Sequence, residues 1–526
     1  MKKIYIYDTT LRDGAQSEGI SFTVKDKIRI SQKLDELSVD FIEGGWPGAN
    51  PKDNEFFSQA RKALKLKNAK LVAFGSTRRA ASSANKDAIL QNLLKAETGY
   101  ITIFGKSWDL HVKEVFKVSP KENLEMIEDS VRFLKKHGKK VFFDAEHFFD
   151  GYNENPRYAL ETLEAAVSGG AEVIILCDTN GGAVTSTIFE VVEDVAAKIG
   201  VPLGIHCHND SDMAVANSVA AIEAGCVQVQ GTFNGYGERC GNANLVSILP
   251  TLKFKLRLNC LSQFAFKELT EASRYIADIA NVKQQDSQAY VGKSAFSHKA
   301  GVHINAMLKN ARTYEHIAPE EVGNKRRMLI SELSGKSSVI MKAEEFGLKF
   351  DGKSDKAKEI LEHVQDLENK GYQFELAEAS LILLMKKAAK LFKKYFEMDE
   401  FRVMVEKRHA APVVSEATVK LKIGKENVHT VSLGDGPVHA MDQALRKALI
   451  KYYPALNKMH LSDFRVRVLD EKAGTAGKVR VLIQSQDEID SWWTVGVSEN
   501  IIEASWIALR DSIEYKFMKD ESGNKK

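Results

Sequence analysis

The chain has 526 residues, 28% of them charged and 44% hydrophobic, and its formal net charge is +3 at pH 7. The length predicts roughly two to four globular domains, and the nearly balanced charge, without a basic stripe of interleaved aromatic residues, argues against nucleic acid or an anionic membrane as a partner and for small molecules. The apolar run near residue 1 is too short for a signal peptide, no stretch is long enough to span a bilayer, and the five cysteines are too scattered for a disulfide framework, so we expect a reduced, cytoplasmic protein.

Short runs rich in β-branched and aromatic residues alternate with amphipathic segments through the first half of the chain. The runs cover residues 3–8, 39–45, 69–75, 99–105, 139–146, 171–178, 202–208 and 227–233. Helical periodicity is clearest over residues 24–37 and 120–138, the second of which ends at a glycine. Eight such units in about 250 residues match a closed parallel barrel, whereas open doubly wound sheets usually have fewer strands. We predict a TIM-type (β/α)8 barrel over residues 1–270.

Polar and ionisable residues follow most of these runs. Arg12 and Asp13 come after the first, Glu146 ends the fifth, and Thr179 follows the sixth. The carboxyl ends of parallel barrel strands meet at one mouth, where the active sites of such barrels lie. The alternative is that strand ends are polar only because they are solvated.

A histidine pair in "GIHCHND" (residues 204–210) stands out at the end of the seventh run. His206 and His208 are two residues apart, so on a strand both imidazoles point the same way and Cys207 points the other way. Two imidazoles and an oxygen donor suit Zn²⁺, Mn²⁺ or Co²⁺. Asp13, next to the eighth strand in a closed barrel, offers a carboxylate, and Asn242 an amide oxygen. The alternative is an ordinary core or surface histidine pair.

Three segments resemble the signature sequences of a metal-dependent, acyl-CoA-condensing barrel family that includes 2-isopropylmalate, homocitrate and citramalate synthases. They are "DTTLRDGAQ" (8–16), "IHCHND" (205–210) and "GYGERCGNANL" (235–245). The likeness extends from residue 1 to about residue 520. Ala15 and "FGSTRRA" (74–80) are similar to the citramalate-forming group of the family.

The resemblance implies that Asp13, His206 and His208 hold a divalent metal (Mn²⁺, Mg²⁺, Zn²⁺ or Co²⁺), with Asn242 as a further ligand. A 2-oxo acid chelates such an ion through its ketone and carboxylate oxygens. Arg12 would stabilise the alkoxide formed when the ketone is attacked, because a guanidinium stays protonated. The structural alternative for Arg12 is an ion pair with Asp8 or Glu146.

The resemblance also implies a site for deprotonating acetyl-CoA, the co-substrate, whose methyl group is a weak carbon acid. Glu146 occupies the position of the catalytic glutamate of the family. His303, in "HKAGVHINA", is its expected helper, and Tyr314, in "RTYEHI", matches a tyrosine that the partner subunit delivers. Thr179 would bind the oxo-acid carboxylate, or alternatively cap the helix after the sixth strand.

The second half of the chain contains no comparable cluster of catalytic residue types. We expect helical connecting subdomains over residues 271–400 and an α+β domain over residues 401–520. In that last domain, strands at 415–424 and 427–434 precede a helix at 437–453, and strands at 464–471, 477–485 and 492–498 precede one at 501–517. The "TV" of residues 430–431 recurs at 494–495, which suggests a strand–helix duplication. The resemblance implies a regulatory and dimerisation domain that binds an end-product amino acid; the alternative is dimerisation without a ligand.

Four functions remain open at this point. The resemblance favours a homodimeric acyltransferase that joins acetyl-CoA, pyruvate and water to give (R)-citramalate and coenzyme A, the first step of a threonine-independent isoleucine route, with isoleucine as effector. The same chemistry on 2-oxoisovalerate would give 2-isopropylmalate. A metal-dependent lyase or aldolase would use the same barrel, and a non-enzymatic amino-acid sensor would leave the metal ligands without purpose.

Overall fold

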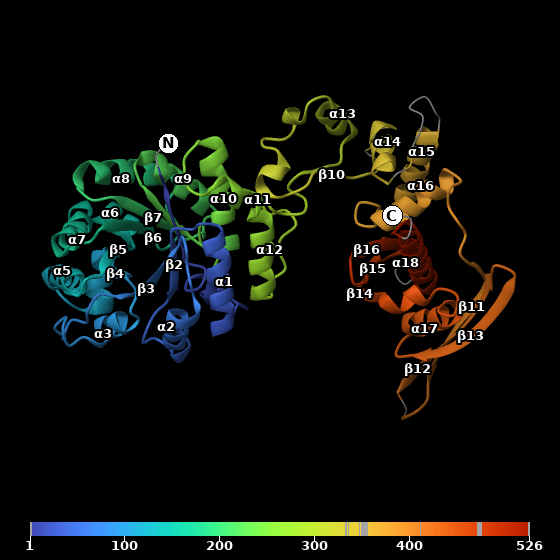
Figure 1. The fold of residues 1–526 in the computed structure, drawn as a ribbon, viewed down its shortest axis with the longest axis horizontal. Helices are drawn as coiled ribbons and strands as arrows, with labels where there is room; N and C mark the ends of the chain where they lie inside the picture. The colour runs from blue at the N-terminus through green and yellow to red at the C-terminus, as the bar shows by residue number, and fades with distance from the viewer. Residues whose placement is uncertain are drawn as a thin grey trace. The chain divides into compact units, whose positions relative to one another are not determined.

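The computed structural model describes residues 3–331, 334, 336–346, 348, 356–410, 412–470 and 476–523. The chain forms two compact units, which Figure 1 shows as ribbons. The first comprises Met1–Phe296 and His316–Arg326, and the second comprises Ser297–Glu315 and Arg327–Lys526. The boundaries predicted after residues 270 and 400 remain predictions. In the described part of the chain, no helix has both the length and the apolar composition needed to cross a membrane.

The first unit contains the predicted closed parallel barrel. Its strands are β1 (Tyr5–Asp8), β2 (Phe41–Gly45), β3 (Lys70–Ser76), β4 (Tyr100–Lys106), β5 (Lys140–Glu146), β6 (Val173–Asp178), β7 (Leu203–Cys207) and β8 (Gln228–Gly231). β1 pairs in parallel with both β2 and β8, which closes the barrel. All eight predicted strands are therefore present in the predicted order.

Helices surround these strands on the outside of the barrel (Figure 1). They are α1 (Val24–Glu36), α2 (Pro51–Ala63), α3 (Ala88–Lys95), α4 (Asp109–His111), α5 (Pro120–Lys136), α6 (Phe148–Glu154), α7 (Pro156–Gly169), α8 (Thr185–Lys198), α9 (Ala214–Ala224), α10 (Leu245–Pro250), α11 (Gln263–Lys267) and α12 (Leu269–Ala280). Local sequence explains where they begin. A capping box formed by Thr23 and Asp26 starts α1, and Ser119 caps α5 by accepting from the N–H of Glu122.

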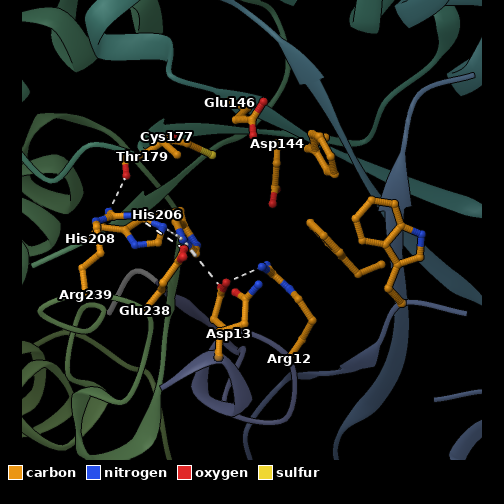
Figure 2. Close-up of a pocket in the computed structure, with 14 residues that line it drawn as sticks. Arg12, Asp13, Asp144, Glu146, Cys177, Thr179, His206, His208, Glu238 and Arg239 are labelled. Carbon is orange, nitrogen blue, oxygen red and sulfur yellow. Dashed lines mark hydrogen bonds and ion pairs between the residues drawn. The ribbon is translucent and has the colours of Figure 1, made fainter. Parts of the chain in front are cut away.

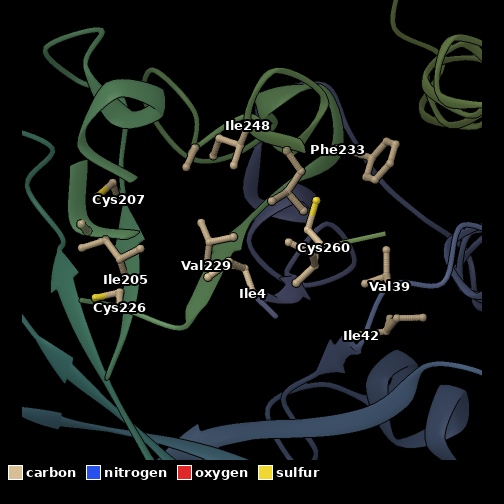
Figure 3. Close-up of a cluster of buried hydrophobic side chains, with 14 of the residues drawn as sticks. Ile4, Val39, Ile42, Ile205, Cys207, Cys226, Val229, Phe233, Ile248 and Cys260 are labelled. Carbon is tan, nitrogen blue, oxygen red and sulfur yellow. The ribbon is translucent and has the colours of Figure 1, made fainter. Parts of the chain in front are cut away.

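Two apolar layers hold the barrel together. The outer layer, part of which Figure 3 shows, packs outward-facing strand residues such as Ile205 and Val229 against the helices. The inner layer fills the barrel axis with Tyr7, Phe41, Val72, Phe142, Ile175 and Cys177. These apolar side chains fill the lower part of the barrel axis, and polar side chains such as Asp13, Asp144 and His206 line the cavity at the carboxyl ends of the strands.

The second unit begins with short elements and helices. β9 (Ser297–His298) pairs with β10 (Arg327–Met328), and α13 (Gly301–Lys309) lies between them in sequence. α14 (Lys336–Glu345), α15 (Lys356–Asn369) and α16 (Glu378–Ala388) follow. Apolar residues of these three helices share a core with β15 and β16, described next.

The predicted duplication is present as two units of three antiparallel strands and one helix. The first has β11 (Glu397–Lys407), β12 (Val413–Ile423), β13 (Glu426–Gly434) and α17 (Pro437–Leu449); the second has β14 (His460–Val468), β15 (Val479–Gln486), β16 (Ser491–Ser498) and α18 (Ile501–Gly523). The hydroxyls of Thr430 and Thr494, from the repeated "TV", donate to the carbonyls of Ala444 and Ala508, each at 2.8 Å. The sequence analysis missed β11, which lies at a sheet edge; most of its residues are exposed, while Phe401 and Val403 pack partly against the core.

Candidate active site

A cavity of about 230 Å³ opens at the carboxyl ends of the barrel strands. Six residues predicted from the sequence line it together: Arg12, Asp13, Glu146, Thr179, His206 and His208. Figure 2 shows their side chains converging from β1, β5, β6 and β7 and the segments that follow these strands. The prediction that these residues meet at one mouth is therefore confirmed by the fold.

The histidine pair occupies one wall of the cavity. His206 Nε2 lies 3.4 Å from His208 Nε2 and 3.7 Å from Asp13 Oδ2. Two ligand atoms bound to one ion at tetrahedral angles lie about 3.4 Å apart. Cys207 points outward into the apolar core, as the alternation of a strand requires.

Several buried polar atoms around this pair have no hydrogen-bond partner among the described residues. They are Asp13 Oδ2, His208 Nδ1 and both amide atoms of Asn242. Asn242 is 2% exposed and forms a backbone bridge opposite His208. Unsatisfied polar atoms cost free energy when buried, so their concentration here fits a site that binds a charged or polar ligand. In the described part of the chain, no group of three or more His, Cys, Asp or Glu side chains has the geometry to hold a metal ion. The polar atoms around the histidine pair therefore do not form a complete coordination sphere in this structure.

The charges at this wall suit a cation. Burial lowers the pKa of His206, and burial together with repulsion from His206 lowers the pKa of His208 to about 3, so both rings are neutral near pH 7. Burial is the largest single influence on the pKa of Asp13 and raises it, but the Arg12 charge, the two histidines and a hydrogen bond with Thr9 together outweigh burial and hold the pKa below its ordinary value. Neutral imidazoles beside a carboxylate are the protonation states that bind divalent metals.

Arg12 extends from the segment after β1 to the opposite side of the cavity. Its Nε donates to Glu43 Oε1 at 2.6 Å, its Nη1 pairs with Asp13, and its guanidinium lies 3.8 Å from the ring centroid of Phe74. The alternative of a pair with Asp8 or Glu146 is wrong. Glu43 lies in the second predicted strand run, residues 39–45, and the barrel brings it to Arg12 because β1 and β2 are neighbours.

Two further carboxyl groups line the cavity from β5. Glu146 pairs with Lys106 at the end of β4. Asp144 is buried, and burial followed by the charge of Glu43 raises its pKa well above the ordinary value. Sequence reasoning missed Asp144 and Lys106, although Asp144 lies two residues before Glu146 and therefore faces the same side of the strand.

Thr179 lies on the rim after β6. Its hydroxyl oxygen accepts from the backbone N–H of His147 at 2.8 Å, and its carbonyl accepts from Arg239 at 2.8 Å. It does not cap the following helix, because α8 begins at Thr185 and Val184 precedes it.

His303 and Tyr314 belong to the second unit. Their rings stack with centroids 4.1 Å apart, and both side chains are exposed. They are not among the residues that line the barrel cavity. Their assignment to the reaction stays a prediction.

An aromatic wall of the cavity was not predicted. Phe74 and Phe104 stack with centroids 5.6 Å apart, and Trp46 meets their rings edge-on at 5.8 and 5.6 Å. Trp46 directly follows β2, and Phe74 and Phe104 lie two residues before the ends of β3 and β4, where alternation of inward and outward residues is the signal that points to them.

Comparison with known families accounts for nearly the whole chain. Residues 3–276 match the model of the HMGL-like family, residues 290–372 match the homocitrate synthase post-HMGL domain-like family, and residues 375–517 match the LeuA allosteric (dimerisation) domain. The three matches follow one another in the order of the barrel, the helical segment and the duplicated unit.

Curated relatives share the full length of the chain. An (R)-citramalate synthase of Aquifex aeolicus (strain VF5) is 54% identical, with 99% of each chain covered, and one of Geobacter sulfurreducens is 53% identical, with 100% of each chain covered. A 2-isopropylmalate synthase of Methanocaldococcus jannaschii is 32% identical, with 99% of this chain and 96% of the relative covered.

Proposed function

Because this chain belongs to the HMGL-like family and, over its whole length, to the (R)-citramalate synthases, we propose that it condenses acetyl-CoA with pyruvate and water to give (R)-citramalate and coenzyme A. The observation that carries the proposal is full-length identity of 46–54% to five such enzymes. In this reaction a proton leaves the acetyl methyl group and the resulting carbanion forms a carbon–carbon bond with the ketone carbon of pyruvate. The ketone oxygen gains a proton, and water then cleaves the thioester.

We place a divalent metal (Mn²⁺, Mg²⁺, Zn²⁺ or Co²⁺) at Asp13, His206 and His208, with Asn242 as a further ligand. The unpartnered buried atoms of Asp13, His208 and Asn242 support this donor set. Once bound, such an ion supplies Lewis-acid polarisation of the ketone. Neutral imidazoles and an ionised carboxylate bind it without first losing protons.

The proposed role of Arg12 is to stabilise the alkoxide that forms at the ketone oxygen. Glu43 and Asp13 hold the guanidinium from two sides and Phe74 supports its face. A donor held in place before the reaction stabilises developing charge without reorganising. Thr179 would donate its hydroxyl hydrogen to the carboxylate of the oxo acid, since its oxygen already accepts from His147.

The proposed base for the acetyl methyl group is Glu146, assisted by His303 and Tyr314. Glu146 lines the cavity, and Lys106 pairs with its carboxylate. Deprotonation of a weak carbon acid needs a base within hydrogen-bond reach of that proton, and a carboxylate can serve as that base. The roles of His303 and Tyr314 rest on the family resemblance. Their rings stack on each other, so the two side chains lie together.

Pyruvate is preferred to larger oxo acids on two grounds. The citramalate synthases are closer in sequence than the 2-isopropylmalate synthases, at 46–54% against 32% identity. Trp46, Phe74 and Phe104 also fill one wall of the 230 Å³ cavity, which restricts the room for an isopropyl group. A pocket discriminates by about 1–3 kcal/mol per methylene.

The proposal for the last domain is homodimerisation and inhibition by isoleucine. The match to the LeuA allosteric (dimerisation) domain supports an assembly and an effector role, and the duplicated strand–helix units form the corresponding structure. An isoleucine effector would place the enzyme at the head of a threonine-independent isoleucine route.

Thiol release from acetyl-CoA tests the function. The metal-stripped protein is incubated with pyruvate, 2-oxobutyrate or 2-oxoisovalerate, with and without each divalent ion. We expect metal-dependent turnover with kcat/KM highest for pyruvate. Highest kcat/KM for 2-oxoisovalerate would replace the proposal by 2-isopropylmalate synthesis, and cleavage of citramalate without condensation would indicate a lyase.

A further inference from the structure

Two glutamines of β8 face the interior of the barrel. Gln228 and Gln230 are 1% and 0% exposed, while Val229 between them points outward into the apolar core. A buried amide costs free energy unless both its ends are hydrogen-bonded. Gln230 uses both ends, whereas Gln228 Oε1 has no partner among the described residues. The two side chains share a strand and a direction but differ in their contacts.

Gln230 connects a predicted metal ligand to a buried carboxyl group. It lies opposite His206 in the parallel pairing of β7 and β8. Its Oε1 is 2.9 Å from His206 Nδ1, and its Nε2 donates to Asp144 Oδ1 at 3.2 Å. Asp144 therefore orients the amide so that its oxygen faces the imidazole.

This orientation determines where the proton of His206 resides. A neutral imidazole carries a hydrogen on one nitrogen and a lone pair on the other. An amide oxygen only accepts, so Nδ1 must donate to it and Nε2 keeps the lone pair. Nε2 is the atom that faces His208 Nε2 and Asp13 Oδ2, at 3.4 and 3.7 Å. The opposite tautomer would point an N–H at the place where the metal ion is proposed.

We infer that Gln230 is a positioning residue of the metal site: its amide, oriented by Asp144, holds His206 in the tautomer and ring orientation that leave Nε2 free to bind a divalent ion. The inference rests on the metal site proposed above and adds two residues to it. Groups that hold the second nitrogen of a metal-binding histidine affect metal affinity by about 10- to 100-fold.

Metal binding to the stripped protein tests this role without relying on turnover. Gln230→Met keeps the length of the side chain but removes the acceptor, Gln230→Glu keeps an acceptor, and Gln228→Met is the matched control on the same strand. Co²⁺ affinity is measured by competition with a chromophoric chelator. We expect Gln230→Met to bind Co²⁺ about 10- to 100-fold more weakly than wild type, Gln230→Glu to recover most of the affinity, and Gln228→Met to stay within about twofold.

A second measurement uses the unmodified protein, so the test does not depend on the variants folding. In metal-free protein labelled with ¹⁵N-histidine, with the His206 signals identified by their loss in His206→Asn, we expect the ring hydrogen on Nδ1. A hydrogen on Nε2, or equal Co²⁺ affinity of wild type and Gln230→Met, would overturn the role of Gln230. Absence of Co²⁺ binding by the wild type would instead refute the metal site.

Discussion

Replacing Arg12 by lysine tests the proposed alkoxide stabilisation. The guanidinium contacts Glu43 at 2.6 Å, pairs with Asp13 and stacks 3.8 Å from the Phe74 ring centroid, all at once. The lysine ammonium is a compact charge without the planar, forked donors of a guanidinium. It cannot keep all these contacts and also donate a hydrogen bond to the substrate. Loss of one preorganised donor costs about 10²- to 10³-fold in kcat, and about 10²-fold corresponds to about 2.7 kcal/mol in the barrier.

The same substitution also changes stability, by a separate route. Glu43 is fully buried and would lose its ion pair with the Arg12 guanidinium, keeping the hydroxyl of Tyr7, which donates to Glu43 Oε2 at 2.5 Å. A buried acceptor that loses a partner costs about 1–3 kcal/mol in the free energy of unfolding. We therefore expect a lower Tm together with the lower kcat.

The assay is thiol release at saturating acetyl-CoA and pyruvate, combined with thermal denaturation and metal content. Arg78→Lys is the matched control, because Arg78 is a buried arginine after β3 that pairs with Asp129 and lies outside the cavity. The control should lose stability but keep kcat within a few-fold. An Arg12→Lys enzyme that turns over within a few-fold of the parent would show that Arg12 has only a structural role.

Three further predictions concern the metal, the effector and acid stability. His206→Ala and His208→Ala should each lose bound metal and activity while circular dichroism stays unchanged; full metal occupancy by elemental analysis in both would end the metal proposal. Isoleucine should bind by calorimetry and shift the apparent affinity for pyruvate about 5- to 150-fold, and removal of residues 401–526 should abolish this; inhibition by leucine alone would favour 2-isopropylmalate synthesis. Burial alone would raise the pKa of Asp487, but backbone N–H donors and Lys516 outweigh it and hold the pKa well below the ordinary value. Asp487→Asn should therefore lower the free energy of unfolding at pH 7, and the difference from wild type should shrink below about pH 4 as the carboxylate is protonated; a constant difference across this range would contradict the reasoning.

The barrel could be predicted because its signals are local. Strand runs bury residues on both faces, as in Val173–Asp178, and several helices carry their own start signal, such as Thr23 before α1 and Ser119 before α5. Apolar periodicity and caps act over a few residues, so they can be recognised without knowing what packs against them. The edge strand β11, most of whose residues are exposed, was missed.

The site residues that lie in recognisable sequence motifs could be predicted. The contacts that arise from packing between strands could not. Asp13, His206 and His208 converge because the carboxyl ends of parallel strands meet, which depends only on the barrel having eight strands. Asp8 and Glu146, the partners considered for Arg12 in the structural alternative, were wrong, and Asp144 was overlooked beside Glu146. The spacing of Asp144 and Glu146 on one strand could have revealed Asp144, whereas the pairing of Arg12 with Glu43 joins two different strands and could not be read from spacing.

The sequence by itself determined the order of strands and helices, the duplicated last domain and the residue types at the mouth of the barrel. Only the tertiary structure decided that Glu43 rather than Asp8 or Glu146 pairs with Arg12, that Gln230 bonds both His206 and Asp144, and that three aromatic rings close one wall. The physical reason is that these contacts join side chains from different strands. Whether two such side chains meet depends on the register and tilt of the closed sheet, and these are set by the packing of the whole barrel.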